Sequence, residues 1–176
     1  MSHISPPESQ EYAPFYSDFI QRASARQDLT AALSLQPDEM KSALGGLSDS
    51  QARFKPGPQE WSIKEVVSHL IDGERVFSYR LLRVSRKDKT PLPGFEQDDY
   101  VREAKADEVA LADLIDEFTF LRRANLLAIQ NMSASALAEV GTASGNPVSA
   151  RALVYILVGH VEHHMASLTE KYLPFA

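Results

Sequence analysis

Apolar side chains recur every three to four residues through most of the chain, a spacing that places them on one face of an α-helix. The pattern predicts a short first helix over residues 11–25 and four long helices over residues 28–44, 61–86, 108–131 and 148–172. Alternation with a period of two, which would indicate strands, is almost absent. The sequence therefore predicts an all-α fold, a four-helix bundle with a short extra N-terminal helix.

One proline complicates the second predicted helix. Asp28 is a suitable N-cap for this helix, and the pair Gly45-Gly46 is a stop signal at its other end. Pro37 lies between them, where it either kinks one helix or occupies the first turn of a new one. The sequence leaves both alternatives open.

The segments between the helices differ in length. The connection over residues 88–105 is long, so we expect it to be functional or to hold short structure of its own. Residues 141–147 are expected to form a loop, and residues 48–53 one further helical turn. Residues 1–10 are expected to form a flexible tail, which leaves residues 11–176 as a single domain.

The composition excludes several kinds of chemistry. No cysteine is present, which excludes disulfides, thiolate zinc sites, iron–sulfur clusters and a cysteine nucleophile. The longest strongly apolar run, residues 152–159, is too short to span a membrane. The first ten residues lack the apolar core of a secretory signal. We therefore expect a cytoplasmic protein with no membrane partner.

The charge distribution argues against a nucleic-acid partner. The net charge is −6, and an acidic surface repels phosphate backbones. One basic run, residues 80–87 (RLLRVSRK), could contact an anion. We interpret it instead as the cation-rich last turns of the helix over 61–86, where positive charge complements the helix dipole.

Two histidines stand on an otherwise apolar helix face. His160 and His164 are four residues apart, so they share one face of the last helix and point into the bundle. They are either core histidines hydrogen-bonded to carboxylates or carbonyls, or two ligands of one metal ion. Glu162 points away from His160 and is expected to be solvated, whereas His163 lies at the flank of the pair.

A third histidine extends this pair to a candidate metal site. His69 lies in the middle of the helix over 61–86, on a face that is half apolar and half acidic. Glu74 is rotated away from that face and is expected in an ion pair at the surface. Three histidine ligands would leave coordination positions open for water or substrate, the pattern of catalytic metal sites. Nitrogen ligands favour zinc, nickel, iron or copper over magnesium or calcium.

Three segments resemble the DinB-like proteins. They are WSIKEVVSHLIDGER (61–75), PLPGFEQDDY (91–100) and GHVEHH (159–164), and they occur in that order. The HxxxH motif alone is weakly specific, but the three segments together are much stronger evidence for the family. The resemblance extends over roughly residues 11–173.

The resemblance implies a fold, a site and an activity. The fold would be a four-helix bundle that holds a divalent metal, zinc or nickel by preference, on His69, His160 and His164. Some DinB-like proteins are thiol-dependent transferases or isomerases that use a low-molecular-weight thiol such as bacillithiol or mycothiol. Relatives with known structures are often dimers, so the resemblance also implies a homodimer, and many members have no assigned reaction.

We therefore expect a metal-dependent enzyme, a thiol S-transferase or hydrolase acting on a small electrophilic molecule. Glu65 and Asp72, one turn before and after His69, could orient its imidazole or act as a base. Ordinary salt bridges, with Lys64 or Arg75 for example, are an equally good explanation of these two carboxylates. His163 is the third candidate for a catalytic role. The alternatives to an enzyme are a non-catalytic metal-binding stress-response protein and a metal-free bundle that acts through partner contacts.

Overall fold

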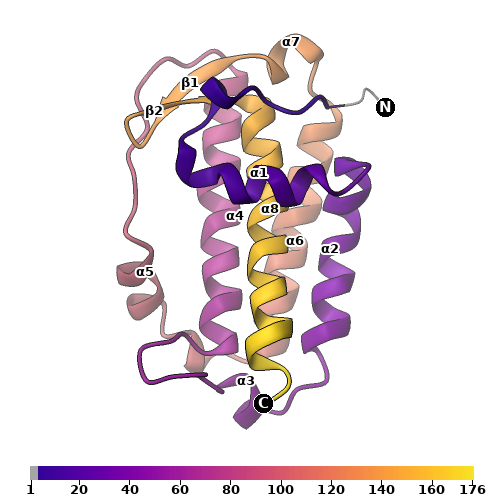
Figure 1. Cartoon of the computed structure of the whole chain (residues 1–176), viewed down its shortest axis with the longest axis vertical. Helices are drawn as coiled ribbons and strands as arrows, with labels where there is room; N and C mark the ends of the chain where they lie inside the picture. Colours follow the sequence, from indigo (N-terminus) through magenta and orange to yellow (C-terminus); the bar gives the residue numbers. More distant parts are fainter. Residues whose placement is uncertain (1–3) are drawn as a thin grey trace.

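Four long helices run side by side and form the body of the protein (Figure 1). The computed structural model describes residues 4–176, so the first three residues of the expected tail, with His3, lie outside the described part. The helices are α2 (Leu29–Leu44), α4 (Ile63–Ser85), α6 (Leu111–Gln130) and α8 (Ala150–Ser167). The predicted all-α four-helix bundle is confirmed.

Helix α8 is central to the core. Residues 150 and 152–161 are buried, because α4, α2 and α1 all pack against this helix. Its first half, through Val158, belongs to one apolar cluster. Val161 and the partly buried Met165 belong to a second cluster with residues of α2, α4 and α6. A functional side chain on α8 is therefore held from several sides.

The short helix α1 (Ser17–Ser24) crosses α8 instead of running along it (Figure 1). The crossing is close because Gly159 has no side chain: a Cβ atom there would collide with the backbone carbonyl of Phe19. This helix begins later than the predicted residue 11. Two 3-10 turns, Ser9–Glu11 and Pro14–Tyr16, precede it, because the ring of Pro14 disfavours helical geometry at the residue before it.

Pro37 lies inside one continuous helix. Helix α2 extends from Leu29 to Leu44 through this residue, which is buried. The structure therefore decides the open alternative in favour of a single helix. The Asp28 carboxylate accepts hydrogen bonds from the backbone N–H groups of Thr30 and Ala31, as predicted for the N-cap.

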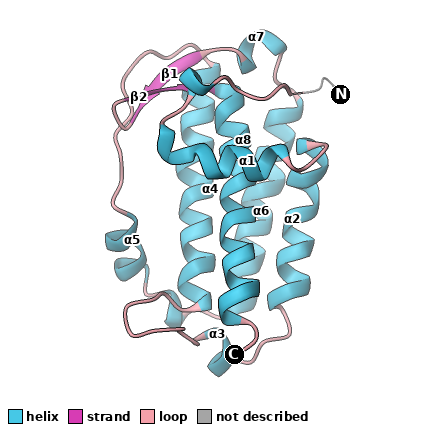
Figure 2. Cartoon of the chain, viewed as in Figure 1, coloured by secondary structure: helices cyan, strands magenta, loops and turns pink. Residues whose placement is uncertain are grey.

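The prediction of a loop over residues 141–147 is wrong. Strands β1 (Val140–Ala143) and β2 (Asn146–Ser149) form an antiparallel hairpin, drawn in magenta in Figure 2. Ser144 and Gly145 join the strands, both with positive φ, as a tight two-residue hairpin requires. Each strand has only four residues, which is too short for an alternating pattern to be visible in the sequence.

Shorter helices complete the chain. Helix α5 (Gln97–Ala104) and the 3-10 turn Ala106–Glu108 occupy the long connection after α4, so this connection holds short structure as expected. Helices α3 (Asp49–Ala52) and α7 (Ala134–Leu137) are single turns, and a π-helical turn, Leu168–Tyr172, follows α8.

The described part of the N-terminal segment contacts α8. The hydroxyl of Tyr155 donates to the carbonyl of Ile4 (3.0 Å), and Arg151 donates to the Ser5 hydroxyl (2.9 Å) and binds Glu11. Among residues 4–176, no helix has both the length and the apolar character needed to cross a membrane.

Candidate metal centre

Helices α4 and α8 bring three histidines together in the bundle. His69 comes from the middle of α4, and His160 and His164 come from successive turns of α8. One ring nitrogen from each lies within 4.8 Å of the other two, and each pair of ring centroids is 4.8 Å apart. The Nε2 atoms of His69 and His160 are 3.0 Å apart. We call these three residues the histidine cluster.

The local sequence makes room for this cluster. Gly73 lies one turn after His69, and a Cβ atom there would lie only 2.5 Å from Cε1 of His160. The missing side chain therefore lets the His160 ring lie against α4. The rings of Phe19 and Phe77 close the other sides, at centroid distances of 5.3 and 5.5 Å from His160.

Burial keeps all three imidazoles neutral. Removal from water lowers the pKa of His69 to about 4 and that of His164 to about 3. Burial also lowers the pKa of His160, and the neighbouring histidines lower it further. Near pH 7 each ring therefore has one nitrogen with a free lone pair, the form that binds metal ions.

The cluster lacks the partners of ordinary core histidines. Within residues 4–176, the hydrogen bond between His69 and His160 is the one such bond that reaches these rings, and none reaches a carboxylate or a backbone carbonyl. Neutral imidazoles gathered without such partners present free lone pairs, so the arrangement favours a ligand that accepts electron pairs.

The donor set fits a divalent transition ion. Two nitrogens bound at about 2.0–2.1 Å to one tetrahedral zinc ion lie about 3.3 Å apart, close to the separation of the two Nε2 atoms. One side of the cluster faces a cavity of about 530 Å³, which is also lined by Phe19, Phe77 and Arg80. The arrangement could therefore hold a metal ion that a small molecule can reach.

His163 lies beside the cluster but is not part of it. Its ring centroid is 5.0 Å from that of His164, and it lines the same cavity. Its Nδ1 atom lies 2.8 Å from a carboxylate oxygen of Asp18, in a pair that is about half exposed to solvent. The structure therefore places this residue at the flank, as expected.

The structure does not bring Glu65 or Asp72 to the cluster. Glu65 closes a capping box at the start of α4, where its carboxylate accepts from the backbone N–H of Ser62 and from Lys55, both at 2.7 Å. Its salt bridge is therefore with Lys55 and not with either of the expected partners. Asp72 is half-buried, which raises the pKa of its carboxyl group, and the charge of Arg75 opposes that shift.

Arg80 was missed by the sequence interpretation. The basic run over residues 80–87 was assigned to the last turns of a helix, but Arg80 is buried and lines the cavity. The signal was present in the spacing, because Arg80 follows His69 by eleven residues. At about 100° per residue this is a rotation of only about 20°, so both side chains share one face of α4.

Asp98 is a second residue that was not singled out. It belongs to the PLPGFEQDDY segment, lies in the first turn of α5 and lines the cavity. Its negative charge opposes the lowering of the His69 pKa. The only signal for it in the sequence was the resemblance of that segment.

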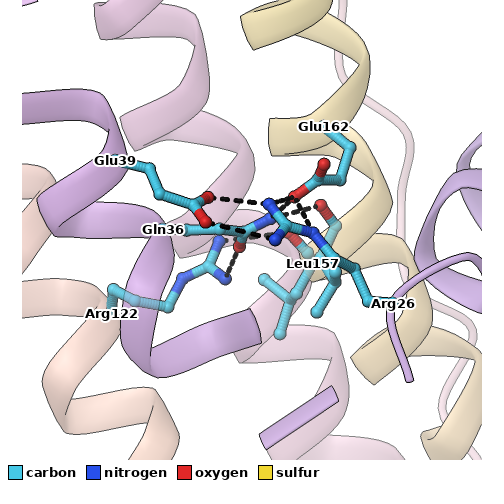
Figure 3. A network of polar contacts seen from close by, with 7 residues as sticks. Arg26, Gln36, Glu39, Arg122, Leu157 and Glu162 are labelled. Carbon is cyan, nitrogen blue, oxygen red and sulfur yellow. Dashed lines mark hydrogen bonds and ion pairs between the residues drawn. The ribbon is translucent and has the colours of Figure 1, made fainter. Parts of the chain in front are cut away.

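A second buried polar cluster lies on another side of α8 (Figure 3). Arg122 is fully buried and donates to the Glu74 carboxylate (2.7 Å), the Gln36 side chain (2.6 Å) and the carbonyl of Leu157 (3.0 Å). The expectation that Glu74 lies at the surface is wrong, because this guanidinium compensates its charge in the core.

Glu162 belongs to the same cluster. Its carboxylate accepts from Arg26 (2.8 Å) and from Gln36 (2.7 Å), so it is partly buried and not simply solvated as expected. We call these residues, together with their partners Glu39 and Asn125, the arginine network.

The fold and the cluster define a class of proteins: four-helix bundles with three histidines gathered between two helices. Residues 32–168, more than half of the chain, match the DinB superfamily, and the chain belongs to that superfamily. The resemblance noted from the sequence is confirmed. A comparison with functionally curated proteins finds no match.

Solved structures show the same fold. YfiT from Bacillus subtilis, described as a probable metal-dependent hydrolase with an unusual four-helix bundle topology, matches with a TM-score of 0.75 at 17% identity, over 91% of each chain. The mycothiol-dependent maleylpyruvate isomerase matches with a TM-score of 0.62 at 12% identity. That match covers 94% of this chain and 62% of the isomerase. At these identities the likeness concerns the fold.

Proposed function

We propose that this protein is a metal-dependent enzyme that transfers a thiol to, or hydrolyses, a small electrophilic molecule at the histidine cluster. The observation that carries the proposal is the meeting of three neutral imidazoles at the wall of a cavity, without carboxylate or carbonyl partners among residues 4–176. His69, His160 and His164 would hold the ion, a divalent transition metal of the kind that nitrogen donors favour, and we propose zinc or nickel.

The chemistry of the site follows from this assignment. A divalent ion bound there would polarise a substrate oxygen and lower the pKa of a coordinated water or thiol. The chain supplies the rest of the site: Phe19 and Phe77 pack against the His160 ring, and His163 lines the cavity, where it can accept or donate a proton. Glu65 has no part in this proposal, because its hydrogen bonds hold it at the start of α4.

Any thiol in the reaction must come from a second substrate. The chain contains no cysteine, so it has no nucleophilic thiol of its own. The name of the mycothiol-dependent isomerase supports a thiol as cosubstrate, and the description of YfiT as a hydrolase supports water. Both alternatives use the same three histidines.

Metal analysis of the untagged protein tests the proposal. After incubation with zinc or nickel and removal of unbound ions, we expect about one equivalent per chain. His69→Ala, His160→Ala and His164→Ala should each lower the affinity by more than about 100-fold, since even outer residues of metal sites contribute 10–100-fold.

His163→Ala is the matched control, because it removes a histidine of the same helix that is not one of the three proposed ligands. Uptake of less than about a tenth of an equivalent by the wild-type protein would overturn the proposal. So would loss of metal in the His163 variant with retention in the His160 variant. A fourth protein ligand that closes the loaded site would exclude catalysis and favour a metal-binding role.

A further inference from the structure

The cavity beside the histidine cluster is also lined by a buried cationic side chain, that of Arg80. Arg80 is only 3% exposed, yet it lines the same cavity as the three imidazoles. Its guanidinium donates to the carbonyl of Pro93 (2.8 Å), to the Ser144 hydroxyl (3.1 Å) and to the Tyr16 hydroxyl (3.4 Å). A guanidinium has five N–H donors, so these three acceptors leave two donors for another ligand.

All three acceptors of Arg80 are neutral. The ion pairs formed by residues 4–176 include none with Arg80, although two carboxylates, Glu96 and Asp98, also line the cavity. The contrast with Arg122 is direct, because that buried guanidinium lies 2.7 Å from the Glu74 carboxylate. Since an uncompensated buried charge is costly, an anion is the ligand that Arg80 is best suited to bind.

The position of Arg80 relates this anion to the proposed reaction centre. Its guanidinium carbon lies 5.9 Å from the centroid of the Phe77 ring, and that ring is 5.5 Å from the ring of His160. A single aromatic side chain therefore connects the two polar ends of the cavity. A small molecule could lie along Phe77 with one end at Arg80 and the other at the histidines.

We propose that Arg80 is a specificity-determining residue that selects substrates carrying a carboxylate group. The planar guanidinium matches a carboxylate in shape and binds it by charge-assisted hydrogen bonds. The inference rests on the proposed function, because it places the reacting end of the same molecule at the histidine cluster. The carboxylate belongs either to the electrophile or to the thiol cosubstrate.

Paired probes test the recognition of the carboxylate. Adipate and its neutral diamide, adipamide, represent an electrophile, and mercaptohexanoate and mercaptohexanol represent a thiol. Calorimetry with zinc-loaded and with metal-free protein should show that the charged member of at least one pair binds more tightly. The pair that shows the preference identifies the source of the carboxylate.

Substitution of Arg80 should remove this preference. Arg80→Gln should weaken binding of the preferred carboxylate by about 10- to 100-fold and leave its neutral partner unchanged. Arg86→Gln is the control, because Arg86 is exposed, ends the same helix and carries the same charge. A residue that only tied the hairpin to α4 would change both members of a pair alike.

Further measurements keep the inference testable if Arg80→Gln does not fold. Arg80→Lys retains the charge but not the planar fork, and should show a smaller loss for the carboxylate probe. A crystal structure of the wild-type protein with the preferred probe should place a carboxylate oxygen within hydrogen-bond distance of Arg80. A carboxylate bound elsewhere would overturn the inference.

The inference and the proposed function fail in different ways. Equal binding of charged and neutral probes by a protein that takes up one equivalent of zinc would overturn the role of Arg80 alone. A carboxylate preference that depends on Arg80, in a protein that binds no metal, would support the role of Arg80 and overturn the metal-dependent reaction.

Discussion

The histidine cluster and the arginine network lie on opposite sides of α8 and differ in how their buried groups are satisfied. Glu162 is about 160° around the helix from both His160 and His164. In the network, the buried Arg122 meets the Glu74 carboxylate on α4 and two carbonyl oxygens, of Gln36 on α2 and Leu157 on α8. Figure 3 shows Arg122 with Gln36 and Leu157. In the cluster, the three uncharged rings share a single hydrogen bond within the described part of the chain.

The difference separates a structural role from a functional one. Both terminal nitrogens of the Arg122 guanidinium have oxygen partners, and among residues 4–176 only its Nε is buried without one, so the network holds α2, α4, α6 and α8 in register. Buried imidazoles without such partners weaken the fold unless a ligand completes them. We therefore expect damage to the network to reduce stability, and damage to the cluster to reduce metal binding.

The largest effect should follow removal of the central arginine of the network. Arg122→Met leaves Glu74 buried without its partner and should reduce the free energy of unfolding by about 3–5 kcal/mol. Denaturant unfolding measures this change. Arg123→Met, at the exposed neighbouring position, should stay within about 0.5 kcal/mol of the wild type. Folded Arg122→Met protein should still bind metal. A variant that keeps the wild-type stability but no longer binds metal would contradict the structural role of the network.

The pH dependence of the metal-free protein should report the cluster. His69 titrates near 6.5 in the unfolded chain, but burial lowers its pKa to about 4 in the folded protein. Between these values the unfolded state binds more protons, so stability falls as the pH drops from about 6.5 towards 4 and is unaffected by this group above about pH 7.

Urea unfolding in the presence of a chelator measures this slope. His69→Gln should lower it by about 1.4 kcal/mol per pH unit in that window, the value for one proton. The matched variant His163→Gln changes a half-exposed ring. Equal slopes in the wild-type protein and the His69 variant would show that the buried ring does not stay neutral.

A smaller and more specific effect is expected from Gly73→Ala. The new Cβ atom would lie 2.5 Å from Cε1 of His160, so the ring must move although no ligand is replaced. We expect a loss of about 10–100-fold in zinc affinity, as for other changes that misplace a ligand. Competition with a chromophoric chelator measures it. Gly46→Ala is the control, because a Cβ atom there meets no atom within 4 Å; equal affinities would mean that α4 yields without disturbing His160.

The sequence predicted the helices because their signal is local. Amphipathic repeats longer than fifteen residues identify α2, α4, α6 and α8, and the spacing of His160 and His164 within one helix identifies two of the three histidines of the site. The meeting of His69 with that pair depends on which helices are neighbours, which the repeats do not contain. The resemblance to the DinB-like proteins supplied this information, because it implied that His69 binds the same metal ion as His160 and His164.

The errors concern groups whose partners are distant in the chain. Glu74 was expected at the surface, because its own helix does not show that Arg122 lies opposite, 48 residues later. Arg80 was interpreted from neighbouring cations, whereas its bonds reach Ser144, 64 residues away, in a hairpin too short to recognise. A buried charge is visible in a sequence only when its partner is close along the helix.

The smallest effect should follow a change in the ion pair between His163 and Asp18, which tests whether His163 is independent of the histidine cluster. His163 lies next to His164 in sequence, but it is about half exposed and faces Asp18, whose pKa is lowered by Arg22 first and by His163 second. Exposed pairs contribute about 0–1 kcal/mol, so Asp18→Asn should change the free energy of unfolding by less than about 1 kcal/mol and leave zinc uptake unchanged. Unfolding curves and metal analysis of the same preparation check both expectations. A loss of zinc in this variant would mean that the Asp18 pair supports the metal ligands, and that solvent exposure does not separate His163 from the cluster.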